Sequence, residues 1–215
     1  MPLQNRMTPF GEVVVAPWRG ALMGNRGCIH DADGRLGVRR WRHQNWVCCV
    51  TSFRERHRHP MPPGRWTALF FWDEAAALAA GHRPCGECRY QDYKRFMAAW
   101  EQTGLPGGPG RGGPRLVDRT LHRARVTRRR EQVRFKARSE TLPDGCFVVV
   151  PEGEHMPMLL WAGRLHHLSL ADGRYYDAGL PPEEVTVLTP APIVQVLGEG
   201  YAPATRLACN VKSGP

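Results

Sequence analysis

Short apolar runs separated by glycine-rich and polar segments characterise the first hundred residues. β-Forming runs predict strands over residues 12–16, 46–53 and 66–71. Residues 74–80 predict a short helix, because Asp73 is a suitable N-cap and Gly81 a suitable terminator. Apolar residues at helical spacing predict a second helix over residues 90–102. Glycine and proline predict loops over residues 20–33 and 57–64.

The pattern changes in the second half of the chain. A basic helix is predicted over residues 116–125, and a short helix over residues 192–198. Between them, short β-forming runs separated by turn signals predict a small antiparallel sheet, with strands over residues 146–150, 158–161, 165–170 and 185–188.

These elements predict an α+β fold with a boundary near the middle of the chain. We expect a zinc-knuckle α+β domain over residues 1–103 and a basic helix with a small β-rich domain over residues 115–215. Residues 104–114 are rich in glycine and proline, which predicts a linker or loop between the two.

Composition narrows the class of protein. The chain has 215 residues, 42% of them hydrophobic and 23% charged, which excludes a mainly disordered chain, a collagen-like repeat and a small disulfide scaffold. No long uncharged apolar run predicts a membrane span, and no export signal is evident, so we expect a cytoplasmic protein. In that compartment the seven cysteines favour metal binding or thiol chemistry over disulfides.

Positive charge is concentrated in two segments. The chain carries a net charge of +10, with eight arginines against one acid in residues 35–65 and ten basic residues against two acids in residues 115–138. Two basic clusters on a slightly acidic body predict a phosphate backbone as partner, namely duplex DNA, including a flipped or damaged base. The alternative is two solvated arginine-rich surfaces.

The segment Gly81–Arg89 (GHRPCGECR) holds the most specific chemical signal. Cys85 and Cys88 are three positions apart on a predicted tight turn, a spacing that lets two thiolates bind one tetrahedral metal ion. Two buried structural cysteines or a thiol–disulfide motif are the alternatives, but the sequence context of a thioredoxin-like fold is not evident.

Residues 69–89 resemble the zinc-binding methyl-phosphotriester domain of Ada-type DNA-repair proteins. In that family an acidic and alanine-rich helix leads into Gly-aromatic-Arg-Pro-Cys-x-x-Cys, and His82 stands here at the aromatic position. The resemblance covers about twenty residues. It implies that Cys85 and Cys88 bind one structural Zn²⁺ ion and that Arg83 and Arg89 lie near DNA phosphate.

The upstream cysteines depart from the family pattern. Cys48 and Cys49 are adjacent, whereas the family's first pair is separated by three residues, so no methyl-accepting residue is carried over. Neighbours on a strand point to opposite faces, and we favour Cys49 as the third metal ligand. The fourth ligand stays open among Cys48, Cys28, His30 and His43.

Two further groups of residues suggest catalysis. Asn25, His30 and Asp31 lie in a glycine-flanked loop, where His30 or Asp31 could act as a base and Asn25 could hold a base edge; an Asx turn with a surface histidine is the alternative. Asp118 and His122 are four residues apart on a predicted helix beside arginines, a pattern that suits hydrolysis of a nucleic-acid bond or simply a solvated pair.

Several residues are candidates for direct DNA contact. Phosphate contacts are expected from Arg26, Arg83, Arg89, Arg119, Arg123, Arg128, Arg129 and Arg130. A base could stack on one of four tryptophans, unless these belong to the core: Trp41, Trp46, Trp66 and Trp72. Removal of Met1 would expose Pro2, which resembles the N-terminal proline that some DNA glycosylases use to form a Schiff base.

Together these patterns lead to three hypotheses. The leading one is a zinc-containing DNA-binding protein that acts in DNA repair or modified-base processing, including as a DNA glycosylase or lyase. The first alternative is a non-enzymatic zinc protein that binds DNA as a regulator or adaptor. The second is a metal-dependent nuclease that uses Asp118 and His122.

Overall fold

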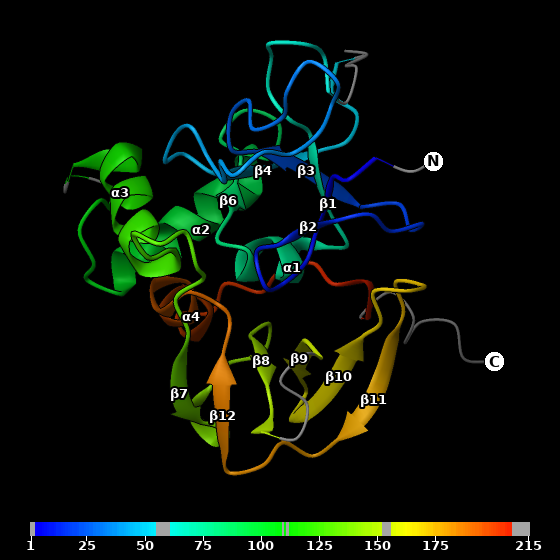
Figure 1. Cartoon of the computed structure of the whole chain (residues 1–215). Coiled ribbons are helices and arrows are strands. Elements are labelled where there is room, and N and C mark those ends of the chain that lie inside the picture. The colour runs from blue at the N-terminus through cyan, green and yellow to red at the C-terminus, as the bar shows by residue number, and fades with distance from the viewer. Residues whose placement is uncertain (1–2, 55–60, 109, 111, 152–155, 208–215) are drawn as a thin grey trace.

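A computed structural model describes residues 3–54, 61–108, 110, 112–151 and 156–207. These residues form four α-helices, one short 3-10 helix and two six-stranded sheets, which confirms the α+β class. Figure 1 shows one sheet above the other, with helix α1 between them and α2, α3 and α4 at one side. Within the same residues, no helix combines the length and apolar character that crossing a membrane requires.

The first sheet is built from the N-terminal half of the chain and is mixed. Its strands, in spatial order, are β2 (Val13–Val14), β1 (Arg6–Met7), β5 (Leu69–Phe71), β3 (Leu22–Asn25), β4 (Val47–Val50) and β6 (Arg83–Pro84). β1 runs parallel to β5 and β4 runs parallel to β6, whereas the other neighbours are antiparallel. The β4–β6 pairing places Cys48 beside Pro84, so the strand with two cysteines lies next to the cysteine turn.

The second sheet confirms the antiparallel unit predicted for the C-terminal half. Its strands, in spatial order, are β11 (Tyr175–Gly179), β10 (Arg164–Leu168), β9 (Met158–Trp161), β8 (Phe147–Val149), β12 (Glu184–Val187) and β7 (Phe135–Arg138). Every pair of neighbours is antiparallel. The 3-10 helix Ser139–Thr141 follows β7.

Helix α1 (Glu74–Ala79) is the element that joins the two sheets. Asp73 caps it, because its carboxylate accepts a hydrogen bond of 3.0 Å from Ala76 N. Ala76 packs against the second sheet, whereas Ala77 packs against the first. Small side chains on both faces let the sheets approach a helix whose residues are all buried.

The remaining helices share one core beside the sheets. α2 (Tyr90–Gln102), α3 (Gly113–Arg125) and α4 (Ala191–Gly198) bring together buried side chains that include Trp100, Leu121 and Ile193. This core draws on residues from both sides of segment 104–114. The division into two domains stays a prediction.

The first sheet contains strands that the sequence did not reveal. The segment predicted as a loop, residues 20–33, contains β3. Gly24 is necessary there, because a Cβ atom would lie 2.4 Å from the Val47 carbonyl oxygen and 3.0 Å from the Phe71 ring. β1 and β6 have only two residues each and therefore leave no periodic signal.

A cysteine cluster and an arginine-lined cavity

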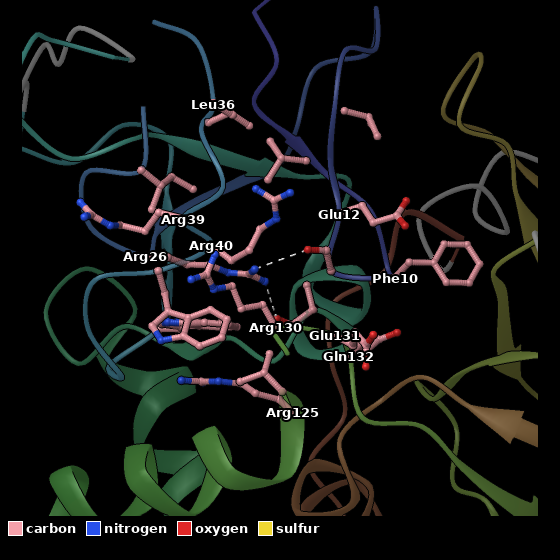
Figure 2. Close-up of a pocket in the computed structure, with 18 of the residues that line it drawn as sticks. Phe10, Glu12, Arg26, Leu36, Arg39, Arg40, Arg125, Arg130, Glu131 and Gln132 are labelled. Carbon is pink, nitrogen blue, oxygen red and sulfur yellow. Dashed lines mark hydrogen bonds between the residues drawn. The ribbon is translucent and has the colours of Figure 1, made fainter. Parts of the chain in front are cut away.

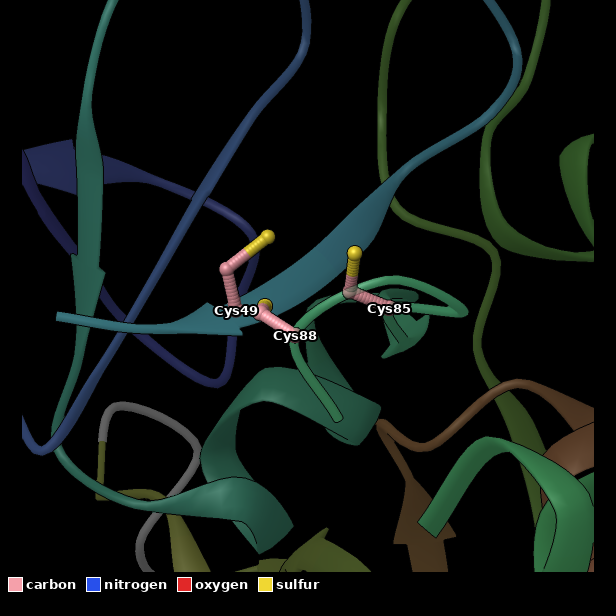
Figure 3. A group of neighbouring side chains, drawn as sticks. All are labelled: Cys49, Cys85 and Cys88. Atoms are coloured by element: carbon pink, nitrogen blue, oxygen red, sulfur yellow. The ribbon is translucent and has the colours of Figure 1, made fainter. Parts of the chain in front are cut away.

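Three cysteine side chains converge at one end of β4 (Figure 3). Cys49 lies on β4, and Cys85 and Cys88 lie on the turn between β6 and α2. The Sγ atoms of this cysteine cluster all lie within 4.8 Å of one another, so the cluster can hold a metal ion. Thiolates at about 2.3 Å from a tetrahedral ion are about 3.8 Å apart, a separation that is comparable with the spacing of these three sulfurs.

Hydrogen bonds within the cluster favour a thiolate at Cys85. The Cys49 thiol and the backbone N–H groups of Cys88 and Glu87 lower the pKa of Cys85 to about 5, although burial opposes them. Interaction with Cys85 raises the pKa of Cys49, and burial raises that of Cys88. One negative charge among three sulfurs is the state expected without a cation, and a divalent metal ion stabilises all three thiolates.

The cluster opens into a small pocket of about 110 Å³. Met23, Phe53, Trp66 and Phe70 contribute to its apolar lining. Among the described residues, no further histidine, cysteine or carboxylate joins the three cysteines. These three donors therefore leave one position of a tetrahedral ion without a ligand from the described chain.

The other proposed ligands lie elsewhere. Cys48 points to the opposite side of β4, where it is buried and accepts a 3.1 Å hydrogen bond from Arg89 Nη1; burial raises its pKa to about 12. Cys28 Sγ lies 3.6 Å from the His30 carbonyl oxygen, and His43 Nε2 lies 3.0 Å from Asn25 Oδ1. The structure does not bring these groups to the cysteine cluster.

Arg83 and Arg89 fix the cysteine turn from inside the protein. Arg89 Nη2 lies 2.8 Å from Glu74 Oε1 and 2.7 Å from Asp92 Oδ2. Arg83 forms two hydrogen bonds with Asp118, Nε to Oδ1 at 2.8 Å and Nη2 to Oδ2 at 2.7 Å. Both arginines are buried and paired with carboxylates of the fold, an arrangement that favours a structural role for them; their expected place near DNA phosphate stays a prediction.

The two basic segments of the sequence meet around a second, larger cavity (Figure 2). Arg130 Nη1 donates a 2.8 Å hydrogen bond to the Val38 carbonyl oxygen, and Arg125 Nη2 donates one of 2.7 Å to Gln44. The cavity has a volume of about 540 Å³. Six arginines line this arginine cavity: Arg26, Arg39, Arg40, Arg125, Arg130 and Arg134.

Two of these arginines are buried against one tryptophan. The guanidinium carbons of Arg26 and Arg125 each lie 3.7 Å from the centroid of the Trp46 ring, and Trp46 is 1% exposed. Arg26 donates to the Ala80 carbonyl oxygen and Arg125 to the Gly81 carbonyl oxygen. Burial, together with the positive charge of Arg40, lowers the pKa of Arg26 to about 9.

The loop proposed as catalytic does not assemble a site. His30 is buried and its Nδ1 lies 2.5 Å from Thr67 Oγ1. Asp31 is exposed and accepts hydrogen bonds from the backbone N–H groups of Asp33 and Arg35. The hydrogen bonds of Asp31 correspond to the Asx turn of the alternative interpretation, but His30 is buried rather than at the surface.

Asp118 and His122 lie on α3 but serve different neighbours. Both carboxylate oxygens of Asp118 are bonded to Arg83. His122 packs its ring edgewise on Trp41 and Trp46, and burial lowers its pKa to about 4. The interpretation of Asp118 and His122 as a solvated pair is therefore wrong, because Asp118 is buried. Their side chains also do not form an acid–base pair with each other, since both oxygens of Asp118 bind Arg83.

The remaining candidates for DNA contact are distributed over several surfaces. Arg119, Arg123, Arg128, Arg129 and Arg130 are exposed. Trp41 lines the arginine cavity and is half-buried, and Trp66 lines the pocket at the cysteine cluster. Trp46 is fully buried, and Trp72 packs against the guanidinium group of Arg206. Pro2 lies outside the described residues.

Sequence reasoning missed Arg40 and Arg125 as lining residues of a cavity. Arg125 ends the predicted basic helix, and its spacing of four and eight residues from Leu121 and Val117 places it on the buried apolar face of that helix. That periodicity could have identified Arg125 as a buried residue, whereas the place of Arg40 beside the cavity depends on the pairing of the two basic segments, which only tertiary structure displays.

Comparison of the chain with known protein families, with curated proteins and with solved structures finds no match in any of the three. Function must therefore be argued from the geometry of the cysteine cluster and the arginine cavity.

Proposed function

We propose that this chain is a zinc-containing DNA-binding protein that acts in DNA repair or modified-base processing. The observation that carries the proposal is the meeting of two basic segments, far apart in sequence, around one cavity. Six exposed arginines lie close in sequence to the contacts that join the two segments, and they are here called the arginine face: Arg39, Arg40, Arg42, Arg128, Arg129 and Arg130.

The charges of the arginine face are available to a ligand. Among the described residues, none of these six side chains forms an ion pair with a carboxylate, whereas Arg138 and Arg164 on the second sheet do. Unpaired guanidinium groups at this density repel one another, and a phosphate backbone relieves that repulsion while releasing its condensed counterions. This contrast supports polyanion binding at the arginine face rather than at the sheet.

Zinc is the metal that we propose for the cysteine cluster. Three thiolates are soft ligands, and Zn²⁺ accepts thiolates in a tetrahedral arrangement without a redox change. The ion would cross-link Cys49 on β4 to the turn that carries Cys85 and Cys88, and so stabilise the sheet edge beside the arginine face.

DNA binding is tested by fluorescence anisotropy of a short labelled duplex over a range of salt concentrations. We expect Arg128→Gln with Arg129→Gln to reduce the slope of log K against log salt by about 2, since each phosphate contact contributes about 0.9. Arg138→Gln with Arg164→Gln removes the same net charge elsewhere and should leave the slope unchanged. Absence of binding by the wild type at low ionic strength would refute the proposal.

The metal is tested by elemental analysis of the purified protein. Wild type and Cys28→Ser should carry about one zinc ion per chain, whereas Cys85→Ser with Cys88→Ser should carry none. Cys28 is the matched control, because it is half-buried like Cys85 but lies outside the cluster. Equal zinc in all three proteins would remove the cysteine cluster from the proposal.

A role in repair is tested with duplexes that each carry one lesion, with and without a chelator. Product that persists after chelation supports a glycosylase or lyase. Loss on chelation and recovery with Mg²⁺ supports a nuclease. Binding without product supports a regulator or adaptor, the outcome that agrees with the engaged side chains of His30 and Asp118.

A further inference from the structure

The inner wall of the arginine cavity contains positive charge that the fold does not neutralise. Arg26 is 3% exposed and Arg125 is 2% exposed, and the Nε atom of each is buried without a hydrogen-bond partner. Their other nitrogens reach mainly backbone carbonyl oxygens, which carry no net charge. Buried charges are ordinarily paired, as Arg83 and Arg89 are in this same protein.

The rest of the lining does not supply the missing negative charge. Glu12 and Glu131 are the only acidic residues that line the cavity among the described residues, against six arginines. Neither forms an ion pair with a described arginine. The cavity therefore has an excess of about four positive charges over a volume suited to a small ligand.

We infer that the arginine cavity binds a phosphate monoester carried on a nucleoside, either the terminal phosphate of a DNA strand or a free mononucleotide. The strand-end form of this inference rests on the proposed DNA binding. Arg26 and Arg125 are the inner contacts, and Arg40 and Arg134 are the outer ones.

The charge of the ligand follows from the two inner arginines. A phosphate monoester carries close to two negative charges at neutral pH, whereas a diester within a strand carries one. A dianion can compensate both Arg26 and Arg125, which share the Trp46 ring and repel each other. Guanidinium groups also bind phosphate oxygens through paired N–H donors.

The size and lining of the cavity account for the nucleoside. A volume of about 540 Å³ exceeds what a phosphate ion fills and lies within the range of about 300–1,000 Å³ typical of small-molecule sites. Its lining includes apolar side chains, among them Ile29 and Leu36, and the half-buried ring of Trp41. An aromatic ring of this kind offers a stacking surface for a base.

The test compares short oligonucleotides that differ only in a 5′-phosphate or a 5′-hydroxyl, using the full chain and calorimetric titration. We expect the wild type to bind the phosphorylated strand about tenfold or more tightly. Arg40→Gln with Arg134→Gln should reduce this preference by about tenfold, since both side chains line the cavity while the inner pair stays in place. Arg42→Gln with Arg128→Gln removes the same charge from the same two segments outside the lining and should retain the preference.

Further ligands separate the sources of the phosphate. Binding of a 5′-mononucleotide with the same dependence on Arg40 and Arg134 supports the inference with a free nucleotide as ligand. Phosphate preference by strands alone supports it with a DNA end. Competition by inorganic phosphate as strong as by the mononucleotide overturns the nucleoside part. Equal affinity for both strand ends, with DNA binding intact, overturns the inference and leaves the proposed function standing.

Discussion

The ion pair between Arg83 and Asp118 connects β6 to α3, and its removal is expected to weaken the whole protein. Their side chains are 7% and 8% exposed, and both carboxylate oxygens accept hydrogen bonds. Asp118→Ala leaves the Arg83 charge buried without a partner. Breaking a buried pair in this way costs about 3–5 kcal/mol of the free energy of unfolding.

Urea denaturation, followed by tryptophan fluorescence, measures this loss. Asp118→Asn keeps the shape and one acceptor oxygen, so we expect a smaller loss, of about 2 kcal/mol. Arg83→Met with Asp118→Leu removes both charges together and should be more stable than Asp118→Ala, because no unpaired charge stays buried.

The reasoning is refuted if Asp118→Ala unfolds within about 1 kcal/mol of wild type, the value expected for an exposed pair. It is also refuted if the double variant is the less stable protein. A catalytic role for Asp118 makes the opposite prediction, namely lost activity with the free energy of unfolding unchanged.

Two further predictions concern single buried positions. Burial lowers the pKa of His82 well below its usual value, so the unfolded chain takes up a proton that the folded chain excludes. The free energy of unfolding should therefore fall as the pH drops below about 6.5, by up to about 1.4 kcal/mol per pH unit for this residue. His82→Phe should reduce that pH dependence in urea denaturation between about pH 7 and about pH 5, the range in which a histidine of the unfolded chain titrates. An unchanged pH dependence would contradict the exclusion of a proton from buried His82. Gly107→Ala should lower the melting temperature measurably more than Gly110→Ala, because its Cβ atom would lie 2.4 Å from Val117 N whereas that of Gly110 meets nothing within 4 Å; equal melting temperatures would contradict this close approach.

Elements with a local cause could be predicted from the sequence. Helix α1 is an example, since the residues directly beside it, Asp73 as N-cap and Gly81 with a positive φ after its last turn, determine where it begins and ends. Strand alternation likewise separated Cys49 from Cys48, and the structure brings only Cys49 to Cys85 and Cys88. The periodicity of apolar residues and the capping of helices depend on a few neighbouring residues, so both can be recognised without knowing the fold.

Features with a distant cause could not be predicted. Gly24 belongs to a strand because Val47 and Phe71 lie against it, although its neighbours in sequence indicate a loop. The helical spacing of Asp118 and His122 predicts that they form a pair, yet the partner of Asp118 is Arg83, 35 residues away. Counting charge along the chain located two basic segments but gave no sign that they enclose a cavity.

Strand β4 connects the cysteine cluster to the arginine cavity. Trp46 immediately precedes β4, and the guanidinium groups of Arg26 and Arg125 pack against its ring. Cys49, three residues after Trp46, belongs to the cysteine cluster. Between them Cys48 is held by Arg89, which is itself fixed by Glu74 of the central helix. The two guanidinium groups repel each other, but each is attracted to the Trp46 ring, so the position of Trp46 fixes both of them. A metal ion bound to the cluster, as proposed above, would tie β4 to the neighbouring turn and so hold Trp46 in place. On the two proposals above, the cysteine cluster would support anion binding by holding the strand next to Trp46, on which the inner arginines pack, without contacting the anion itself.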